Sequence, residues 1–207
     1  MVKPWTGEPR EWAVGSLAGK LLVATPNLLD PNFYRTVVLM CVHEEEGALG
    51  VVLNRPTESD VLEHVPEWHH LAASPPVVFV GGPVEPGGAL AVGRLAERPE
   101  GGAGTSDTNG EPPEGWTAVT SEVGLLDLGR TPDEFAGVGQ VRLFSGHSGW
   151  GAEQVVAEIE EDAWFVVDSA PGDAFTREPQ TLWREVLRRQ SARLAMFADY
   201  PDDPRVN

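Results

Sequence analysis

Apolar residues recur along this chain in short runs, which are separated by proline, glycine and polar residues. Short runs that are rich in β-branched side chains are typical of β-strands. The polar residues 44–47 stand between two such runs and predict a hairpin. The predicted strands cover residues 20–24, 36–42, 48–53, 77–80, 90–95, 116–120, 140–144 and 163–167.

Helical spacing of apolar residues appears mainly in the C-terminal half. In residues 152–161 the apolar side chains fall on one face and the glutamates on the other. Residues 179–197 predict a longer helix, because their large apolar residues recur at helical intervals. Shorter helices are predicted after Ser59, and after Thr131, which opens a capping box with proline at the first helical position. Strands and helices alternate irregularly, which predicts a mixed sheet with flanking helices.

Residues 97–115 interrupt this pattern, since they are rich in Gly, Pro, Glu, Ser and Thr and nearly lack large apolar groups. Such a segment cannot offset its ordering entropy by burial, so it predicts a flexible acidic loop. The strand pattern resumes afterwards, so the loop lies inside one domain. We expect residues 1–16 to form an N-terminal arm, 17–198 the domain and 199–207 a C-terminal tail.

Composition fits one globular domain. The chain has 207 residues, of which 41% are hydrophobic, and domains usually contain about 100–200 residues. No apolar run approaches the roughly 18 residues of a membrane span, and the first residues lack the apolar core of a signal peptide. One cysteine, Cys41, excludes an intramolecular disulfide. Together these features predict a cytoplasmic protein that does not bind membranes.

Acidic residues dominate the charge, with 32 acidic and 15 basic residues and a net charge of −17. Such a charge repels phosphate backbones, so direct binding to nucleic acid is not expected. The densest basic cluster lies on the predicted helix of residues 179–197 and is either a local patch or a solvated helix face. Its members are Arg184, Arg188, Arg189 and Arg193.

The most informative motif is the glycine-rich stretch of residues 144–151, which predicts a turn between a strand and a helix. It nearly matches the nucleophile elbow of hydrolases, with Ser148 as the nucleophile, but Trp150 stands where the elbow needs glycine. The turn could instead bind an anion through its backbone N–H groups, although Glu153 would compete with that anion. The sequence favours a third interpretation, in which the glycines let strand and helix approach closely and Trp150 packs in the core.

Cys41 and His43 alternate on a predicted strand and therefore share a face. A cysteine–histidine pair could be nucleophilic, whereas a lone cysteine in a β-branched strand is more typical of a small buried residue. The remaining histidines do not form a tight ligand motif, so we predict neither a metal site nor a cofactor. These histidines are His64, His69, His70 and His147.

Four motifs, in this order, resemble those of the YqgE/AlgH family. They are residues 19–26 with Asp30, Phe33, Arg35 and Thr36; residues 47–56; residues 81–84; and residues 144–151 with Gln154 and Glu158. The similarity spans about residues 15–190 and includes Trp164 and Trp183. Ser148 is often alanine in the family, which argues against a serine nucleophile, and His147 replaces the usual tyrosine.

The resemblance implies a cytosolic bacterial protein of a largely uncharacterised family. It implies a single-domain α+β fold in which a bifurcated mixed β-sheet folds into a pseudo-barrel with flanking helices. Some family members are labelled transcriptional regulators because of links to exopolysaccharide control. The resemblance supplies no catalytic residue.

These observations favour a non-enzymatic binding or regulatory domain that recognises a small molecule or a protein partner, with any effect on transcription being indirect. The alternative is a hydrolase or transferase that uses Ser148 or Cys41. Clefts form where elements end, so we expect polar, glycine and aromatic residues at these ends to line a ligand cleft. The predicted lining residues are Pro26, Asn27, Arg35, Asn54, Arg55, Gly82, Gly146, Trp150 and Gln154.

Overall fold

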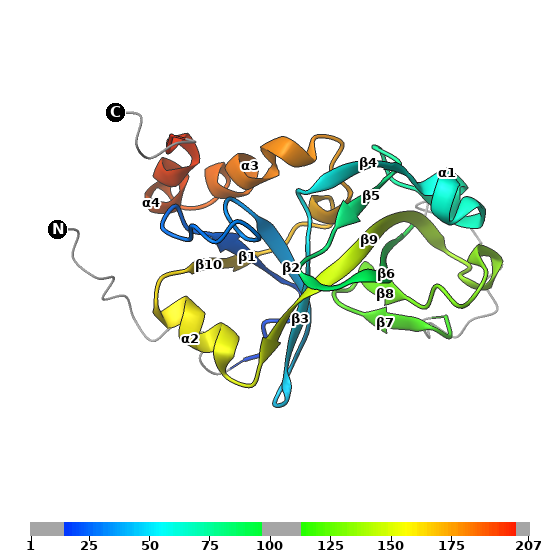
Figure 1. Cartoon of the computed structure of the whole chain (residues 1–207), viewed down its shortest axis with the longest axis horizontal. Helices are drawn as coiled ribbons and strands as arrows, with labels where there is room; N and C mark the ends of the chain where they lie inside the picture. The colour runs from blue at the N-terminus through cyan, green and yellow to red at the C-terminus, as the bar shows by residue number, and fades with distance from the viewer. Residues whose placement is uncertain (1–14, 97–112, 202–207) are drawn as a thin grey trace, which may run out of the picture.

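The computed structural model describes residues 15–96 and 113–201, and within these residues ten strands form one curled sheet (Figure 1). Eight strands follow the order β10-β1-β2-β3-β9-β6-β8-β7, while β4 pairs with β5 and β5 with β9. The strands are β1 (Lys20–Ala24), β2 (Val37–Glu44), β3 (Gly47–Val52), β4 (Pro56–Asp60), β5 (Val77–Val80), β6 (Val84–Leu95), β7 (Trp116–Ala118), β8 (Val123–Leu126), β9 (Val138–Gly151) and β10 (Trp164–Asp168).

Short helices flank this sheet (Figure 1). The α-helices are α1 (Val61–His64), α2 (Gln154–Glu160), α3 (Leu182–Arg188) and α4 (Ala192–Ala195). The 3₁₀ turns are η2 (Pro66–Leu71), η3 (Pro132–Glu134), η4 (Asp173–Phe175), η5 (Pro179–Thr181) and η6 (Met196–Asp199).

The long strand β9 joins the two halves of the sheet. One edge of β9 pairs antiparallel with β6 from residue 138 to residue 147. The other edge pairs in parallel with β5 at Phe144 and Ser145, and then antiparallel with β3 from residue 148 to residue 151. The sheet therefore splits along β9, with β4 and β5 on one branch. This curled, mixed half-barrel in a single domain confirms the predicted fold class.

Both faces of β1 and β2 are buried, which explains why their sequences are almost continuously apolar. Alternate side chains such as Leu21 and Leu39 join a core cluster with α3, which contributes Trp183. The intervening side chains, such as Leu22, join a second cluster with α2, which contributes Ile159. The period-two alternation of a strand thus anchors one helix on each face of this part of the sheet.

Several local predictions agree with the structure. The hairpin between the second and third predicted strands is β2–β3, and the predicted capping box is present, since Thr131 N donates to Glu134 Oε1 at 2.9 Å. The residue that caps α1 is Asp60 rather than Ser59, because the Asp60 carboxylate accepts from the backbone N–H of Leu62 at 2.8 Å. Most of the predicted flexible loop, residues 97–112, lies outside the described residues.

Two local predictions are wrong. Residues 144–151 form a strand rather than a turn, because β6, β5 and β3 supply backbone partners on both edges of β9. The helix predicted over residues 179–197 is divided into η5, α3, α4 and η6. The helical path ends after α3 and restarts after Ser191, whose extended ψ of 154° is incompatible with a continuous helix.

Two glycines allow β9 to pass close to the end of β5. Gly82 has a φ of +153°, and a Cβ atom there would lie 2.3 Å from the carbonyl carbon and oxygen of His147. Gly146 has a φ of +69°, and its Cβ would lie 2.8 Å from the carbonyl oxygen of Gly82. Side chains do not fit at such distances, so both positions require glycine.

We predict that Gly82→Ala lowers the free energy of unfolding by about 2 kcal/mol or more, because the added methyl group forces the backbones of β9 and the 81–83 segment apart. Urea denaturation followed by tryptophan fluorescence measures the change. Gly87→Ala is the matched control, because no described atom lies within 4 Å of a Cβ at that position. Equal stability of the two variants would contradict the close-approach explanation.

Candidate functional site

The four sequence motifs meet through hydrogen bonds of the sheet. The amide of Asn54 links the first two motifs, since its Oδ1 accepts from Val37 N at 3.0 Å and its Nδ2 donates to Arg35 O at 2.8 Å. The third motif lies between the second and the fourth, because Val52 N donates to Gly81 O and the Gly81 N–H donates to the carbonyl of residue 145, both at 2.9 Å. The motifs therefore form a contiguous region held mainly by backbone contacts.

Arg35 occupies a strained position at the end of the 31–35 turn, with a φ of 53°. Its guanidinium carbon lies 4.4 Å from the ring centroid of Trp183, and its Nη2 donates to the carbonyls of Tyr200 and Pro201, each at 2.6 Å. Arg35 thus binds the beginning of the segment predicted to be a tail. Arg55 supports the same turn, because its Nη2 donates to Tyr34 O at 2.9 Å.

The nine predicted cleft residues occupy separate environments. Arg35, Asn54 and Arg55 surround the 31–35 turn, while Gly82 and Gly146 are buried where β5 meets β9. Pro26 is buried and Asn27 exposed just after β1. Trp150 and Gln154 lie beside Glu158 of α2. A cleft shared by all nine residues stays a prediction.

Glu158 organises the contact between α2 and the sheet. Its Oε2 accepts from the indole N–H groups of Trp150 and Trp164, each at 2.9 Å, and its Oε1 accepts from Gln154 Nε2 at 2.9 Å. The ring of Phe33 packs against both indoles, with centroid distances of 6.1 and 5.4 Å. Trp150 is only 5% exposed and Trp164 2%, so these two indoles pack in the core and hold the helix in place.

The geometry gives no support to the enzymatic alternative. Ser148 is fully buried, with 0% exposure, and its Oγ donates to Gly81 O at 3.1 Å. His147 precedes it on the same strand, so the two side chains point to opposite faces. Cys41 is 3% exposed and contacts Leu39 O. The Nδ1 atom of His43 accepts from a backbone N–H at 3.1 Å, which occupies the lone pair that a general base would need.

We predict that the Cys41 thiol does not react with thiol reagents in the folded protein. Burial disfavours the thiolate and raises the pKa of Cys41 to about 12, so the nucleophilic form is absent at neutral pH. Labelling with iodoacetamide at pH 8, followed by mass spectrometry, tests this in native protein and in 6 M guanidinium chloride, about the concentration needed for full unfolding. Rapid labelling of the native protein would contradict the prediction.

A different part of the molecule contains a cavity of about 230 Å³. One wall of the cavity is the sheet face with Leu39 of β2 and Leu53, which follows β3. The other walls are residues 120–123, which lead into β8, and the 169–174 loop, which follows β10. None of the nine predicted cleft residues lines it. The lining residues are Leu39, Leu53, Thr120, Ser121, Val123, Ser169, Ala170, Pro171, Asp173 and Ala174.

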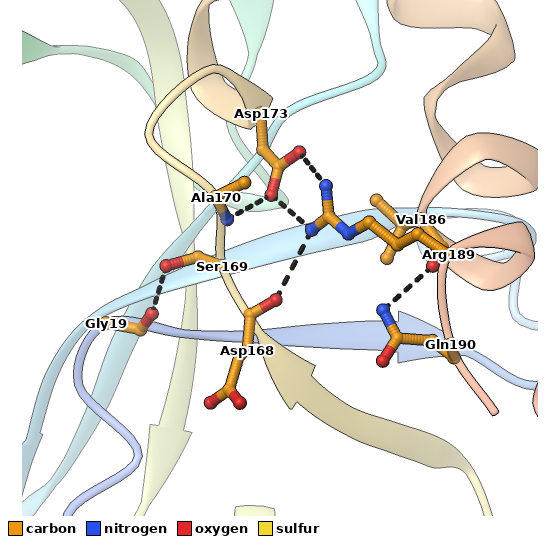
Figure 2. Close-up of polar contacts among 8 residues, drawn as sticks. All are labelled: Gly19, Asp168, Ser169, Ala170, Asp173, Val186, Arg189 and Gln190. Atoms are coloured by element: carbon orange, nitrogen blue, oxygen red, sulfur yellow. Dashed lines mark hydrogen bonds and ion pairs between the residues drawn. The ribbon is translucent and has the colours of Figure 1, made fainter.

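An ion pair fastens the loop beside this cavity (Figure 2). Asp173 is 6% exposed, and its two carboxylate oxygens accept from Nη1 and Nη2 of Arg189, each at 2.5 Å. Asp173 Oδ2 also accepts from Ala170 N at 2.7 Å, and Ser169 Oγ donates to Gly19 O at 2.5 Å. The hydrogen bonds that Arg189 donates to the Asp173 carboxylate raise the pKa of Arg189 above its ordinary value.

A buried arginine supports the same loop from the interior. Arg142 of β9 is 2% exposed, and its N–H groups donate to the carbonyls of Ser74, Pro75, Ala174 and Thr176 at 2.9 to 3.2 Å. Its guanidinium lies over the ring of Phe79, at 4.3 Å from the centroid. Desolvation lowers the pKa of Arg142 to about 10, which leaves it charged at neutral pH.

The importance of Arg142 and Asp173 was missed at the sequence level. Arg142 carries one available signal, because it is a charged residue directly between the apolar residues Val141 and Leu143 of a predicted strand. Asp173 carries none, since an aspartate close to Pro171 and Gly172 is typical of an ordinary turn.

We predict that Arg142→Met lowers the free energy of unfolding by about 3 kcal/mol or more, because the carbonyls of four residues, three of them buried or half-buried, lose their donor. Chemical denaturation measures the loss. Arg177→Met is the control, since Arg177 is exposed and its substitution should change stability by less than about 0.5 kcal/mol. A similar small effect at Arg142 would show that water replaces the lost donors.

Among the residues that the structure describes, no three His, Cys, Asp or Glu side chains gather as a metal site requires. No helix in that part of the chain is long and apolar enough to cross a membrane. The described residues thus form a single domain with a curled mixed sheet and a partly open cavity beside it.

Comparison with known proteins identifies the family. A family model described as AlgH-like matches residues 21–195. A UPF0301 protein of Streptomyces coelicolor is 52% identical over 195 residues, which cover 94% of this chain and 97% of that relative. A UPF0301 protein of Thermobifida fusca is 43% identical over 196 residues, covering 93% and 96%. The chain belongs to the AlgH-like family, as its four motifs predicted.

Solved structures agree with this assignment. An X-ray structure of a Corynebacterium diphtheriae protein is similar, with a TM-score of 0.78, 28% identity and coverage of 94% of both chains. The solution structure of AlgH from Pseudomonas aeruginosa has a TM-score of 0.58 and 23% identity, and covers 95% of this chain and 98% of that one. The second comparison supports the fold alone.

Proposed function

We propose that this chain is a non-enzymatic binding domain that acts in the cytoplasm and takes a small molecule in the cavity beside the 169–174 loop. The observation that carries this proposal is the cavity itself, about 230 Å³ in volume and lined by strand side chains on one side and loop side chains on the other. Small-molecule sites are typically concave and mainly apolar, with a few fixed polar groups.

The chemistry of the lining favours binding over catalysis. The carboxylate of Asp173 is held in a two-pronged ion pair with Arg189, so it is poorly placed to act as a general base. The candidate nucleophiles Ser148 and Cys41 do not line the cavity. No specific observation favours a hydrolase or transferase over a binding domain.

A regulatory role of this domain would act through a protein partner whose binding depends on the ligand. The net charge of −17 disfavours direct contact with DNA. Arg188 and Arg189, which belong to the basic cluster predicted from the sequence, pair with Asp199 and Asp173, which reduces their availability to phosphate groups. Any effect on transcription is therefore proposed to be indirect.

A thermal-shift screen tests the binding function. The library contains neutral, anionic and cationic molecules of about ten heavy atoms, and binding at 100 times Kd should add about 2.7 kcal/mol of stability, or several degrees in Tm. Ala170→Leu narrows the cavity but keeps the backbone N–H that donates a hydrogen bond to Asp173. This variant should therefore lose the ligand-induced increase in Tm.

Ala192→Leu is the matched control, because Ala192 is exposed on α4 and does not line the cavity. This variant should respond like the natural sequence. The proposal fails if no library member stabilises the protein, or if Ala170→Leu responds as strongly as the control.

A further inference from the structure

We infer that the cavity takes a compact, uncharged, mainly apolar molecule that carries a single hydroxyl or carbonyl group, and that Thr120 recognises this polar end. The inference rests on the proposed binding function and adds the chemical class of the ligand. It follows from the size of the cavity, from the arrangement of its apolar and polar walls, and from the charges around it.

The volume limits the ligand to a small molecule. The cavity measures about 230 Å³, whereas an apolar cavity of about 150 Å³ holds benzene and drug-sized sites usually exceed about 300 Å³. A benzene ring with one short substituent therefore fits within this volume.

Apolar and polar groups lie on different walls. The apolar wall belongs to the main core cluster and includes Leu39, Leu53 and Val123. The hydroxyl-bearing and ionised residues come from the two loops, at residues 120–121 and 169–173. A bound molecule would therefore place its apolar body against the sheet and its polar end against these loops.

The charges disfavour an ionised ligand. Asp173 is the one ionisable residue in the lining, and Arg189 already neutralises it through two hydrogen bonds. A cation would have to compete with Arg189 for this carboxylate. An anion would face the carboxylate, and the nearby buried cation, Arg142, already donates to four backbone carbonyls. Burying a charge without a partner is strongly unfavourable, so a neutral molecule fits best.

Three loop hydroxyls line the cavity, on Thr120, Ser121 and Ser169, and those of Thr120 and Ser169 offer one donor and one acceptor. Thr120 Oγ1 accepts from the backbone N–H groups of Glu122 and Val123, at 3.3 and 3.0 Å, and its own O–H can donate. Ser169 Oγ donates to Gly19 O, and its lone pairs can accept. A ligand carbonyl can accept from the Thr120 hydroxyl. A ligand hydroxyl can accept from Thr120 and also donate to Ser169, so either group suits the polar end of the ligand.

Four matched probes test the ligand class: benzyl alcohol, benzoate, benzylammonium and toluene. Titration at pH 7, monitored by ¹H–¹⁵N NMR, measures each Kd and shows whether the shifted amide signals belong to cavity residues. We expect benzyl alcohol to bind at least about tenfold more tightly than either ion, the factor that corresponds to 1.4 kcal/mol. Benzyl alcohol should also bind more tightly than toluene.

A variant separates recognition by Thr120 from simple apolar burial. Thr120→Val keeps the side-chain volume but removes the hydroxyl and its hydrogen bonds from Glu122 N and Val123 N. The affinity for benzyl alcohol should fall to that of toluene, while unchanged toluene binding shows that the turn still lines the cavity. Thr117→Val, at an exposed position on β7, is the control and should change neither affinity. Unchanged Tm and NMR spectra outside the cavity show that the variants remain folded.

The outcomes distinguish the two proposals. Tighter binding of benzoate or benzylammonium at the cavity would overturn the uncharged class and leave the binding function intact. An unchanged preference for benzyl alcohol in Thr120→Val would overturn the role of Thr120. If none of the four probes binds while the wider screen finds a cavity ligand, only the ligand class fails; if that screen also finds none, the binding function fails as well.

Discussion

The exchange of partners along one edge of β9 is the constraint on which the rest of this fold depends. This edge passes from β5 to β3 within a few residues, so the backbones of three strands must converge at one place. Gly82 and Gly146 make this possible, since side chains would not fit between the converging strands. The two branches of the sheet diverge from β9, and the cavity lies beside the face that contains Leu39 of β2.

Hydrogen bonds and an ion pair of two buried charged residues, Arg142 and Asp173, hold the loops around that space. Arg142 gives up its hydration and gains four carbonyl acceptors, two of which belong to the segment that contains Ala174 and Thr176. The carboxylate of Asp173 is compensated from the other side by Arg189, whose side chain remains partly in contact with water. Removing one partner of such a buried contact lowers the stability of the fold by more than the contact contributes to it, because the remaining polar group stays desolvated.

The family motifs and the cavity serve different purposes in this structure. The motifs supply the backbone convergence, the Asn54 bridge between strands and the Glu158 cluster that fixes α2. The cavity is built by residues that these motifs hardly include. The most recognisable part of the sequence therefore identifies the fold, while the part proposed to bind a ligand is assembled by that fold.

The sequence by itself determined eight of the ten described strands, the β2–β3 hairpin and the capping box at Thr131, because β-branched runs and capping residues act through their immediate neighbours. It missed β4 and β8, which the predicted strand ranges do not cover. It did not determine that residues 144–151 form a strand, because a glycine-rich stretch becomes extended only when strands from elsewhere pair with both of its edges. Only the tertiary structure decided the cavity, for Leu39, Thr120 and Asp173 are distant in the chain, and chain packing alone brings them to one space.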